Sequence, residues 1–240
     1  MARESLANFV ILKFGGTSVA SAAGWHKIAA RIGDCLEEGL IPVVVHSALA
    51  GVSTELEKTL DASVRGEQGP HVEKIRTQHR QLGRDLDVDA EALLQDDFET
   101  LTRLTSGIAL IGEISPKQHA RIVALGELMA SRIGHAWLRA KSIDVAAVDA
   151  REVLACRSAP DGEPEENFLS AECPFDPDDA VRQRFCAGAS AYLTQGFIAR
   201  NEDGDTVLLG RGGSDTTAGY LAALIGAKRI EIWTDVAGMY

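Results

Sequence analysis

Two apolar runs separated by a helical stretch open the chain. Residues 9–12 and 40–46 are apolar and rich in β-branched side chains, as is typical of strands covered on both faces of a parallel sheet. Between them, from Trp25 to Leu36, apolar residues recur at intervals of three and four, which predicts one face of a helix. Residues 9–46 therefore predict a strand–helix–strand unit whose two strands run parallel.

A long polar stretch with helical periodicity follows this unit. The helical pattern runs from 54 to about 106, and we expect breaks at 66–70 and 85–89, where turn-forming residues gather. We interpret its charged runs as solvated helix faces; a lid or a subunit contact is the alternative. A further helix is predicted from Ser115 to Trp137, because Ser115 and Gln118 have the spacing of a capping box.

The second half of the chain alternates short strands with loops and helices. We expect strands at 143–148, 192–199, 206–209 and 229–233, a loop-rich segment at 157–177, and helices at 178–189 and 217–226. Turn residues at 201–204 predict a hairpin, and so one antiparallel pair. The pattern as a whole predicts an α/β fold, which binds ligands at the carboxyl ends of its parallel strands.

Composition narrows the class of protein. The chain has 240 residues, enough for one large domain or two small ones, and its formal net charge is −11 with a sequence pI near 5.0. An acidic chain of this kind is a poor general binder of nucleic acid or of anionic membranes. No apolar stretch reaches the length of a membrane span, and the N-terminus lacks the pattern of a secretory signal.

The four cysteines are widely spaced along the chain. Cys35, Cys156, Cys173 and Cys186 form no C-x-x-C pair, so we expect neither a zinc site nor a disulfide framework. We interpret them as reduced thiols. Together with the absence of a signal sequence, this predicts a cytoplasmic protein.

Two glycine-rich turns lie between a predicted strand and a predicted helix. Residues 13–19 read Lys-Phe-Gly-Gly-Thr-Ser-Val, and residues 210–217 read Gly-Arg-Gly-Gly-Ser-Asp-Thr-Thr. Either alone could be a structural turn. Neither matches the Walker A, the dinucleotide-binding or the protein-kinase pattern. Two helix N-termini, each with a cation, suit two anionic groups that face each other, as phosphoryl transfer requires.

Two further polar residues lie inside apolar elements. Gly126 and Glu127 fall within a predicted helix, and either close packing or the approach of a ligand beside Glu127 would explain the glycine. His46 ends the second apolar run. We interpret it as a core or rim histidine rather than as a catalytic residue.

These blocks together resemble the aspartokinases, which belong to the amino-acid kinase fold. The similar blocks follow the order of that family and span nearly the whole chain: residues 13–19, 47–53, 125–128, 195–198 with 210–215, and 233–236. The resemblance implies a three-layer α/β sandwich with a mainly parallel central sheet, forming one catalytic domain over residues 1–240. It also implies ATP-dependent phosphorylation of the β-carboxylate of L-aspartate, which gives 4-phospho-L-aspartate and ADP. That reaction is the first step towards lysine, threonine and methionine.

The resemblance also implies the roles of individual residues. Lys13 would stabilise the transferring phosphoryl group, and Asp215 would orient this lysine and the substrate. Aspartate would be bound by Glu127 at its ammonium group, by Arg211 at its α-carboxylate, and by Ser47, Ser53, Ser214 and Phe197. The nucleotide would contact Lys13, Gly15, Gly16, Thr17, Ser18, Thr234, Asp235 and Tyr240.

The chemistry of aspartate fits these roles. A carboxylate nucleophile with a pKa near ~3.9 is already ionised at pH 7, so no general base is needed. Mg²⁺ would bridge the ATP phosphates, and we predict no metal ligands from the protein itself.

The end of the chain departs from the family pattern. In aspartokinases the chain continues beyond the position of Tyr240 into more of the nucleotide site and usually into ACT-type regulatory domains. We therefore expect a kinase domain truncated at its C-terminal end, without a regulatory domain. Any homo-oligomer would form through parts not present, and a fusion with diaminopimelate decarboxylase is one candidate for the parent protein.

Two other functions are carried as alternatives. One is a non-catalytic module that binds aspartate or nucleotide, and the presence of Lys13, Glu127, Arg211 and Asp215 together argues against it. The other is a kinase of the same fold that acts on another acid, such as acetylglutamate or carbamate. The pairing of Glu127 with Arg211, which fits a free α-amino acid, argues against that.

Overall fold

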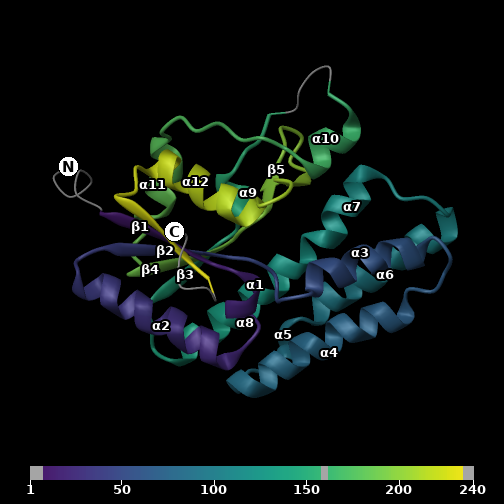
Figure 1. Ribbon diagram of the computed structural model, residues 1–240, viewed down its shortest axis with the longest axis horizontal. Coiled ribbons are helices and arrows are strands. Elements are labelled where there is room, and N and C mark those ends of the chain that lie inside the picture. The colour runs from purple at the N-terminus through teal and green to yellow at the C-terminus, as the bar shows by residue number, and fades with distance from the viewer. Residues whose placement is uncertain (1–7, 158–161, 235–240) are drawn as a thin grey trace.

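A five-stranded parallel sheet forms the centre of the protein (Figure 1). The structure is a computed structural model that describes residues 8–157 and 162–234. Its strand order is β3–β4–β2–β1–β7, and all four neighbouring pairs are parallel. The strands are β1 (Phe9–Phe14), β2 (Ile41–His46), β3 (Val145–Val148), β4 (Ala191–Gln195) and β7 (Arg229–Trp233). The adjacent parallel pair β1 and β2, joined by a helix, confirms the predicted strand–helix–strand unit.

Helices cover both faces of this sheet (Figure 1). One face carries α2 (Ala22–Glu37) and α8 (Leu125–Ala140), and the other carries α9 (Ala150–Val153), α11 (Asp179–Arg184) and α12 (Gly213–Ile225). Alternate side chains of β1 enter opposite cores: Val10 and Leu12 pack on the α2–α8 side, whereas Phe9 and Ile11 pack on the α12 side. The predicted three-layer α/β sandwich is therefore confirmed.

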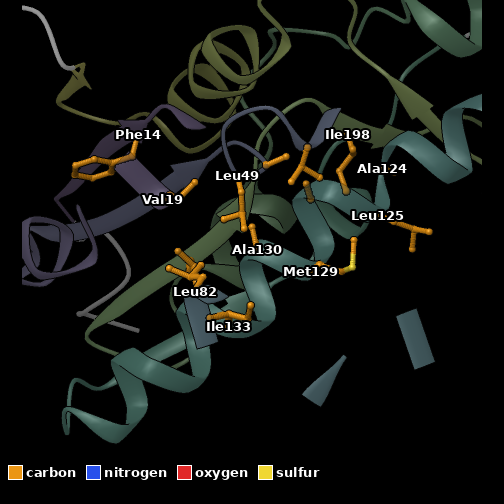
Figure 2. Packing of buried hydrophobic residues seen from close by; sticks show 14 of the residues in the cluster. Phe14, Val19, Leu49, Leu82, Ala124, Leu125, Met129, Ala130, Ile133 and Ile198 are labelled. Atoms are coloured by element: carbon orange, nitrogen blue, oxygen red, sulfur yellow. The ribbon is translucent and has the colours of Figure 1, made fainter. Parts of the chain in front are cut away.

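The α8 side of the core reaches the loop that follows β2. Figure 2 shows Leu125, Met129, Ala130 and Ile133 of α8 in the same apolar cluster as Leu49. All five side chains are at least 95 % buried. This packing fixes the loop after β2 against the first turns of α8.

The predicted helical excursion lies beside the sheet on the right of Figure 1. It consists of α3 (Val52–Ser63), α4 (Gly69–Leu86), the short α5 (Ala90–Leu93) and α6 (Gln95–Ile111), followed by α7 (Pro116–Val123). The expected breaks at 66–70 and 85–89 separate α3 from α4 and α4 from α5. Ser115 caps α7 with Gln118 in the predicted capping box. Among residues 8–157 and 162–234, no helix combines the length and apolar character that a membrane crossing requires.

Two predicted elements are each divided in the structure. The helix expected at 115–137 is interrupted at Ala124, because α7 packs against β6 (Thr206–Leu208) and α10 (Pro164–Leu169) whereas α8 packs against β3 and β4. The strand expected at 192–199 is interrupted at Gly196 and Phe197, since Phe197 has a φ of 69° that a strand cannot contain. Its second part, β5 (Ile198–Arg200), forms the predicted hairpin with β6 (Thr206–Leu208).

Smaller differences lie in the same half of the chain. The loop-rich segment at 157–177 contains α10, and the helix expected at 178–189 is only the short α11. Asp178 caps α11 by accepting hydrogen bonds from two backbone N–H groups of its first turn. Four residues of short helix α1 (Gly16–Val19) also precede α2, directly after the first glycine-rich turn.

The expectation that all four cysteines are free thiols was wrong. Cys156 and Cys173 form a disulfide, whereas Cys35 and Cys186 are free. The two partners lie on segments that face each other, because Arg157 and Glu172 form an antiparallel bridge next to them. Spacing along the sequence does not reveal this pairing. Disulfides are rare in cytosolic proteins, so the cysteines no longer support the predicted cytoplasmic location, which stays a prediction.

Gly134 of α8 lies against the indole ring of Trp25. A Cβ atom at this position would lie 1.8 Å from Cη2 of Trp25, which is fully buried and cannot move aside. We expect Gly134→Ala to lower the free energy of unfolding by about 1–3 kcal/mol, as measured by urea denaturation. The matched control is Gly33→Ala in α2, where a Cβ meets no atom within 4 Å and a gain of about 0.5–1 kcal/mol is expected. Equal effects at both positions would contradict this packing account.

Candidate active site

The candidate site lies where three neighbouring strands of the sheet end. Lys13 is one residue from the end of β1, Ser47 follows β2, and Gln195 ends β4. The strand register pairs Phe14 with His46 and His46 with Gln195, so these ends lie at the same level. A parallel sheet thus brings three loops together at its carboxyl edge, where α/β proteins bind their ligands.

Lys13 and Asp215 form an ion pair across the two glycine-rich turns. The distance from Lys13 Nζ to Asp215 Oδ1 is 2.7 Å, and the lysine side chain is 10 % exposed whereas the aspartate is 53 % exposed. Asp215 lies in the first turn of α12, whose N-terminal end favours a negative charge. The pair holds the lysine ammonium at the mouth of the site.

The turn before α12 presents an arginine to solvent. Gly210 and Gly212 adopt φ values of 70° and 75°, which side chains other than glycine rarely accept. Arg211 between them is exposed. No hydrogen bond or ion pair joins its guanidinium to any residue within the described ranges. This side chain can therefore bind a carboxylate from a ligand without breaking a contact of the protein.

Two serines connect this turn to the loop after β2. Ser47 Oγ donates a hydrogen bond to Ser214 Oγ at 3.0 Å. The loop after β2 also touches the first glycine-rich turn, because Ala50 N–H donates to Gly16 O at 3.1 Å. A Cβ atom at Gly16 would lie 2.8 Å from a backbone oxygen of that loop, so only glycine fits without a shift. Ser53, in the first turn of α3, is half-buried.

Glu127 is a buried carboxyl group with one unsatisfied oxygen. Its Oε1 accepts a hydrogen bond from Ala48 N–H at 3.1 Å, whereas Oε2 has no partner among the described residues. Burial raises the pKa of Glu127 to about 8, although the Ala48 hydrogen bond acts in the opposite direction. Its unpartnered Oε2 can accept a hydrogen bond from a ligand group, such as an ammonium group.

The glycine before Glu127 has a structural explanation. A Cβ atom at Gly126 would lie 3.0 Å from Ala48 Cβ, with Leu56 and Val52 almost as close. Close packing of α8 against the loop after β2 therefore accounts for this glycine. The same close approach brings the Ala48 amide within reach of Glu127.

The first glycine-rich turn borders a cavity of about 370 Å³. Gly15 caps α1 with its backbone, and a Cβ atom there would meet nothing within 4 Å. Thr17, Ser18 and Thr234 line the cavity, together with Phe14 and Trp233, whose rings stack at a centroid distance of 5.9 Å. Lys27 also lines it and was not predicted from the sequence. Asp235 and Tyr240 lie outside the described residues.

His46 has the environment of a core residue. It is fully buried, its Nδ1–H donates to the Ser47 carbonyl oxygen at 2.9 Å, and its ring lies edge-on to Trp25. Burial lowers the pKa of His46 to about 4, so the ring is neutral at pH 7. These contacts favour the structural interpretation of this histidine.

Two buried polar residues of the site region were missed in the sequence. Gln195 accepts a hydrogen bond from Ala150 N–H and donates one to Ser131 Oγ, both at 2.9 Å. Thr217 accepts a hydrogen bond from Phe197 N–H. Gln195 lies beside residues implied by the resemblance, but only the fold shows what its side chain contacts.

Three contacts join the predicted residues into one site. Glu127 binds the Ala48 amide, the adjacent Ser47 binds Ser214, and the adjacent Asp215 binds Lys13. These contacts connect the carboxyl group of Glu127 with the Lys13–Asp215 ion pair. The exposed guanidinium of Arg211 lies on the same turn as Ser214. Among the described residues, no group of three or more histidines, cysteines or acids is placed to hold a metal ion.

The fold and the site together define an α/β protein with charged side chains gathered at the carboxyl edge of a parallel sheet. Comparison with known families identifies the family within this class. The chain belongs to the amino acid kinase family, whose sequence model matches residues 8–240.

Curated relatives within this family are aspartokinases. The chain is 30 % identical over 236 residues to the aspartokinase of Chlamydia muridarum, covering 96 % of this chain and 49 % of that protein. It is 31 % identical over 248 residues to lysine-sensitive aspartokinase 3 of Escherichia coli, covering 98 % of this chain and 51 % of that protein. The chain thus spans about half the length of the curated relatives it matches.

A solved structure shows the same fold. The crystal structure of E. coli aspartokinase III in complex with aspartate and ADP has a TM-score of 0.82 and 30 % sequence identity, over 97 % of this chain and 50 % of that one. Membership of the amino acid kinase family, inferred from the sequence motifs, is therefore confirmed.

Proposed function

We propose that this protein is an aspartate kinase, which transfers the γ-phosphoryl group of ATP to the β-carboxylate of L-aspartate. The products are 4-phospho-L-aspartate and ADP, in the first step towards lysine, threonine and methionine. The observation that carries the proposal is the contact line from Glu127 through Ser47 and Ser214 to the Asp215–Lys13 pair. The relatives named aspartokinase and the aspartate and ADP complex of the E. coli enzyme support it.

Aspartate carries one ammonium and two carboxylate groups, and the site offers a counterpart for each. Glu127, whose Oε2 has no partner in the described part of the chain, receives the ammonium group, and the exposed Arg211 binds the α-carboxylate. Ser47, Ser53, Ser214 and Phe197 surround the same region. The β-carboxylate is then directed towards Lys13.

ATP is proposed to bind at the first glycine-rich turn. Backbone N–H groups of Gly15 and Gly16 would hold its phosphates, and Thr17, Ser18 and Thr234 line the adjacent cavity. Asp235 and Tyr240 complete the proposed nucleotide contacts from outside the described residues. Mg²⁺ would be held by the phosphates and would neutralise their charge. We do not assign Asp215 as a ligand of this ion, because its carboxylate already pairs with Lys13.

Catalysis in this site needs positioning and charge neutralisation rather than a base. The β-carboxylate of aspartate, with a pKa near ~3.9, is already an anion at pH 7. It attacks the γ-phosphorus while the bond to the ADP oxygen breaks, and both oxygens carry negative charge. Lys13 stabilises that charge, and Asp215 fixes the position of the lysine ammonium group.

Trapping with hydroxylamine tests the reaction. The complete gene product, given Mg-ATP and L-aspartate, is expected to form an acyl phosphate that hydroxylamine converts to aspartyl hydroxamate, measured with ferric chloride. N-acetyl-L-aspartate is the matched control, because it lacks the ammonium group that Glu127 would bind. Product from N-acetyl-L-aspartate or acetylglutamate alone would favour a kinase for another acid. Aspartate binding without any product would favour a non-catalytic module.

A further inference from the structure

The chain bends between β4 and β5 at a residue with an unusual backbone. Phe197 has a φ of 69°, in the left-handed region that bulky residues rarely adopt. Its carbonyl oxygen accepts a hydrogen bond from Leu209 N–H at 2.9 Å, and its N–H donates to Thr217 Oγ1 at 2.9 Å. A conformation of this kind persists only where surrounding contacts hold it.

Thr217 makes two hydrogen bonds with one buried hydroxyl group. Its Oγ1 accepts from Phe197 N–H and donates to Gly213 O at 2.8 Å, and the residue is completely buried. Donor and acceptor capacities are therefore both used. Among the described residues, this is the side-chain hydrogen bond that joins Phe197 to α12.

The two turns that this hydroxyl joins are in direct contact. A Cβ atom at Gly196 would lie 2.7 Å from Ser214 Cβ, and one at Gly213 would lie 2.5 Å from Cδ2 of Phe197. No side chain separates them, so a shift of Phe197 displaces the first turn of α12. That turn carries Ser214 and Asp215, and Arg211 immediately precedes it.

We propose that Thr217 is a positioning residue for aspartate binding, an inference that rests on the proposed function. Its hydroxyl group fixes Phe197 against the first turn of α12 and thereby sets Arg211 and Ser214 relative to Ser47. Without the hydroxyl group, the part-buried Phe197 N–H loses its partner and the turn relaxes. Displacements of about 1 Å in substrate-positioning groups can lower activity by about 100-fold.

Three variants of the complete gene product separate positioning from stability. Thr217→Val keeps the shape and removes the hydroxyl group, whereas Thr217→Ser keeps the hydroxyl group. Thr105→Val in α6 is the matched control, because Thr105 is also buried and its Oγ1 donates to the Leu101 carbonyl oxygen one turn earlier, far from the site residues. Should Thr217→Val not fold, Thr217→Ala removes the same hydroxyl group without adding a methyl group.

We expect Thr217→Val to lower kcat/KM for aspartate by about 10- to 100-fold, with KM for ATP changed less than about threefold. Thr217→Ser and Thr105→Val should stay within about threefold of the wild type. Amide hydrogen exchange gives a readout that does not need turnover: exchange at 196–198 and 213–216 should accelerate in Thr217→Val and not in Thr217→Ser.

The outcomes are distinguishable from failure of the proposed function. If the wild-type protein forms no acyl phosphate, that result contradicts the proposed reaction. The exchange measurement still decides whether Thr217 holds the two turns together. Two results would overturn the positioning role of Thr217. One is that amide exchange at 196–198 and 213–216 is as slow in Thr217→Val as in the wild type, and the other is that kcat/KM for aspartate is unchanged in an active enzyme. Equal losses in Thr217→Val and Thr217→Ser would also overturn it.

Discussion

Replacing Lys13 by methionine is expected to lower kcat by about 10³-fold while leaving the protein folded. Lys13 is a nearly buried cation at the carboxyl edge of the sheet, positioned by the 2.7 Å ion pair with Asp215. Charges aimed at a transferring phosphoryl group are worth roughly 10³-fold or more in related reactions. Methionine retains most of the side-chain volume, and Asp215 is exposed enough to be solvated when its partner is removed.

Two measurements separate catalysis from folding in this variant. Calorimetric titration should still detect aspartate, because Glu127 and Arg211 are intact. Lys141→Met, at the exposed C-terminal end of α8, is the control and should keep wild-type kcat. A Lys13→Met protein that binds aspartate and turns over at more than about a tenth of the wild-type rate would contradict the role of Lys13.

Replacing Glu127 by glutamine is expected to weaken aspartate binding and to stabilise the free protein. Loss of a hydrogen-bonded charge partner in a buried site costs about 2–5 kcal/mol, or roughly 30-fold or more in affinity. The effect on stability has the opposite sign. Burial raises the pKa of Glu127 from 4.5 to about 8, so at pH 7 this group is protonated when folded and ionised when unfolded.

The sign of the pH dependence follows from proton binding. Since the folded protein holds the proton more tightly, the stability contributed by neutral Glu127 is present below pH 4.5 and is lost as pH rises towards 8. Glutamine removes this dependence, so Glu127→Gln should raise the free energy of unfolding at pH 7 by up to about 3 kcal/mol. Urea denaturation at pH 5, 7 and 8 measures the change.

Aspartate binding to the wild type should show the same proton. An ammonium group binds the ionised carboxylate, so binding releases a proton from Glu127 and the affinity for aspartate should increase up to about pH 8. Glu55→Gln is the matched control, because Glu55 is also buried but pairs with His71 and Lys74, and Lys74 lowers its pKa. That variant should lose stability at pH 7 and keep wild-type aspartate affinity. Destabilisation by Glu127→Gln would contradict the account.

The sequence pattern was sufficient to predict secondary-structure elements where local signals and burial agree. The continuous apolar runs of β1 and β2 suit strands buried on both faces, and the capping box at Ser115 places the start of α7. The breaks between α3, α4 and α5 contain Gly66, Asp87 and Asp89, and Pro70 lies in the first turn of α4, so these signals act locally.

The sequence pattern was insufficient where tertiary contacts decide the backbone. Phe197 adopts a positive φ because Thr217 and Leu209 bind its backbone. Gly196 is a local sign of a break, but the sequence does not assign the positive φ to Phe197. The Cys156–Cys173 pairing depends likewise on two segments that meet only in the fold.

The candidate site shows the same division between local and tertiary information. Its motifs and the family resemblance predicted Lys13, Glu127, Arg211 and Asp215 as site residues. The ion pair of Lys13 with Asp215 and the unsatisfied Oε2 of Glu127 required the structure. The positioning contacts of Thr217 were equally hidden, because a threonine inside a helix is unremarkable in sequence.

An oxygen-18 transfer experiment tests the central claim most directly. The complete gene product is incubated with Mg-ATP, hydroxylamine and L-aspartate labelled with oxygen-18 in its β-carboxylate, and the released phosphate is examined by phosphorus NMR. If the β-carboxylate attacks the γ-phosphorus, hydroxylamine cleaves the acyl phosphate at carbon, and each phosphate keeps one labelled oxygen. We predict that the amount of labelled phosphate equals the amount of hydroxamate formed, and that labelled phosphate is lost in Lys13→Met. Release of ADP with unlabelled phosphate, or no hydroxamate at all, would contradict the claim that this site phosphorylates aspartate.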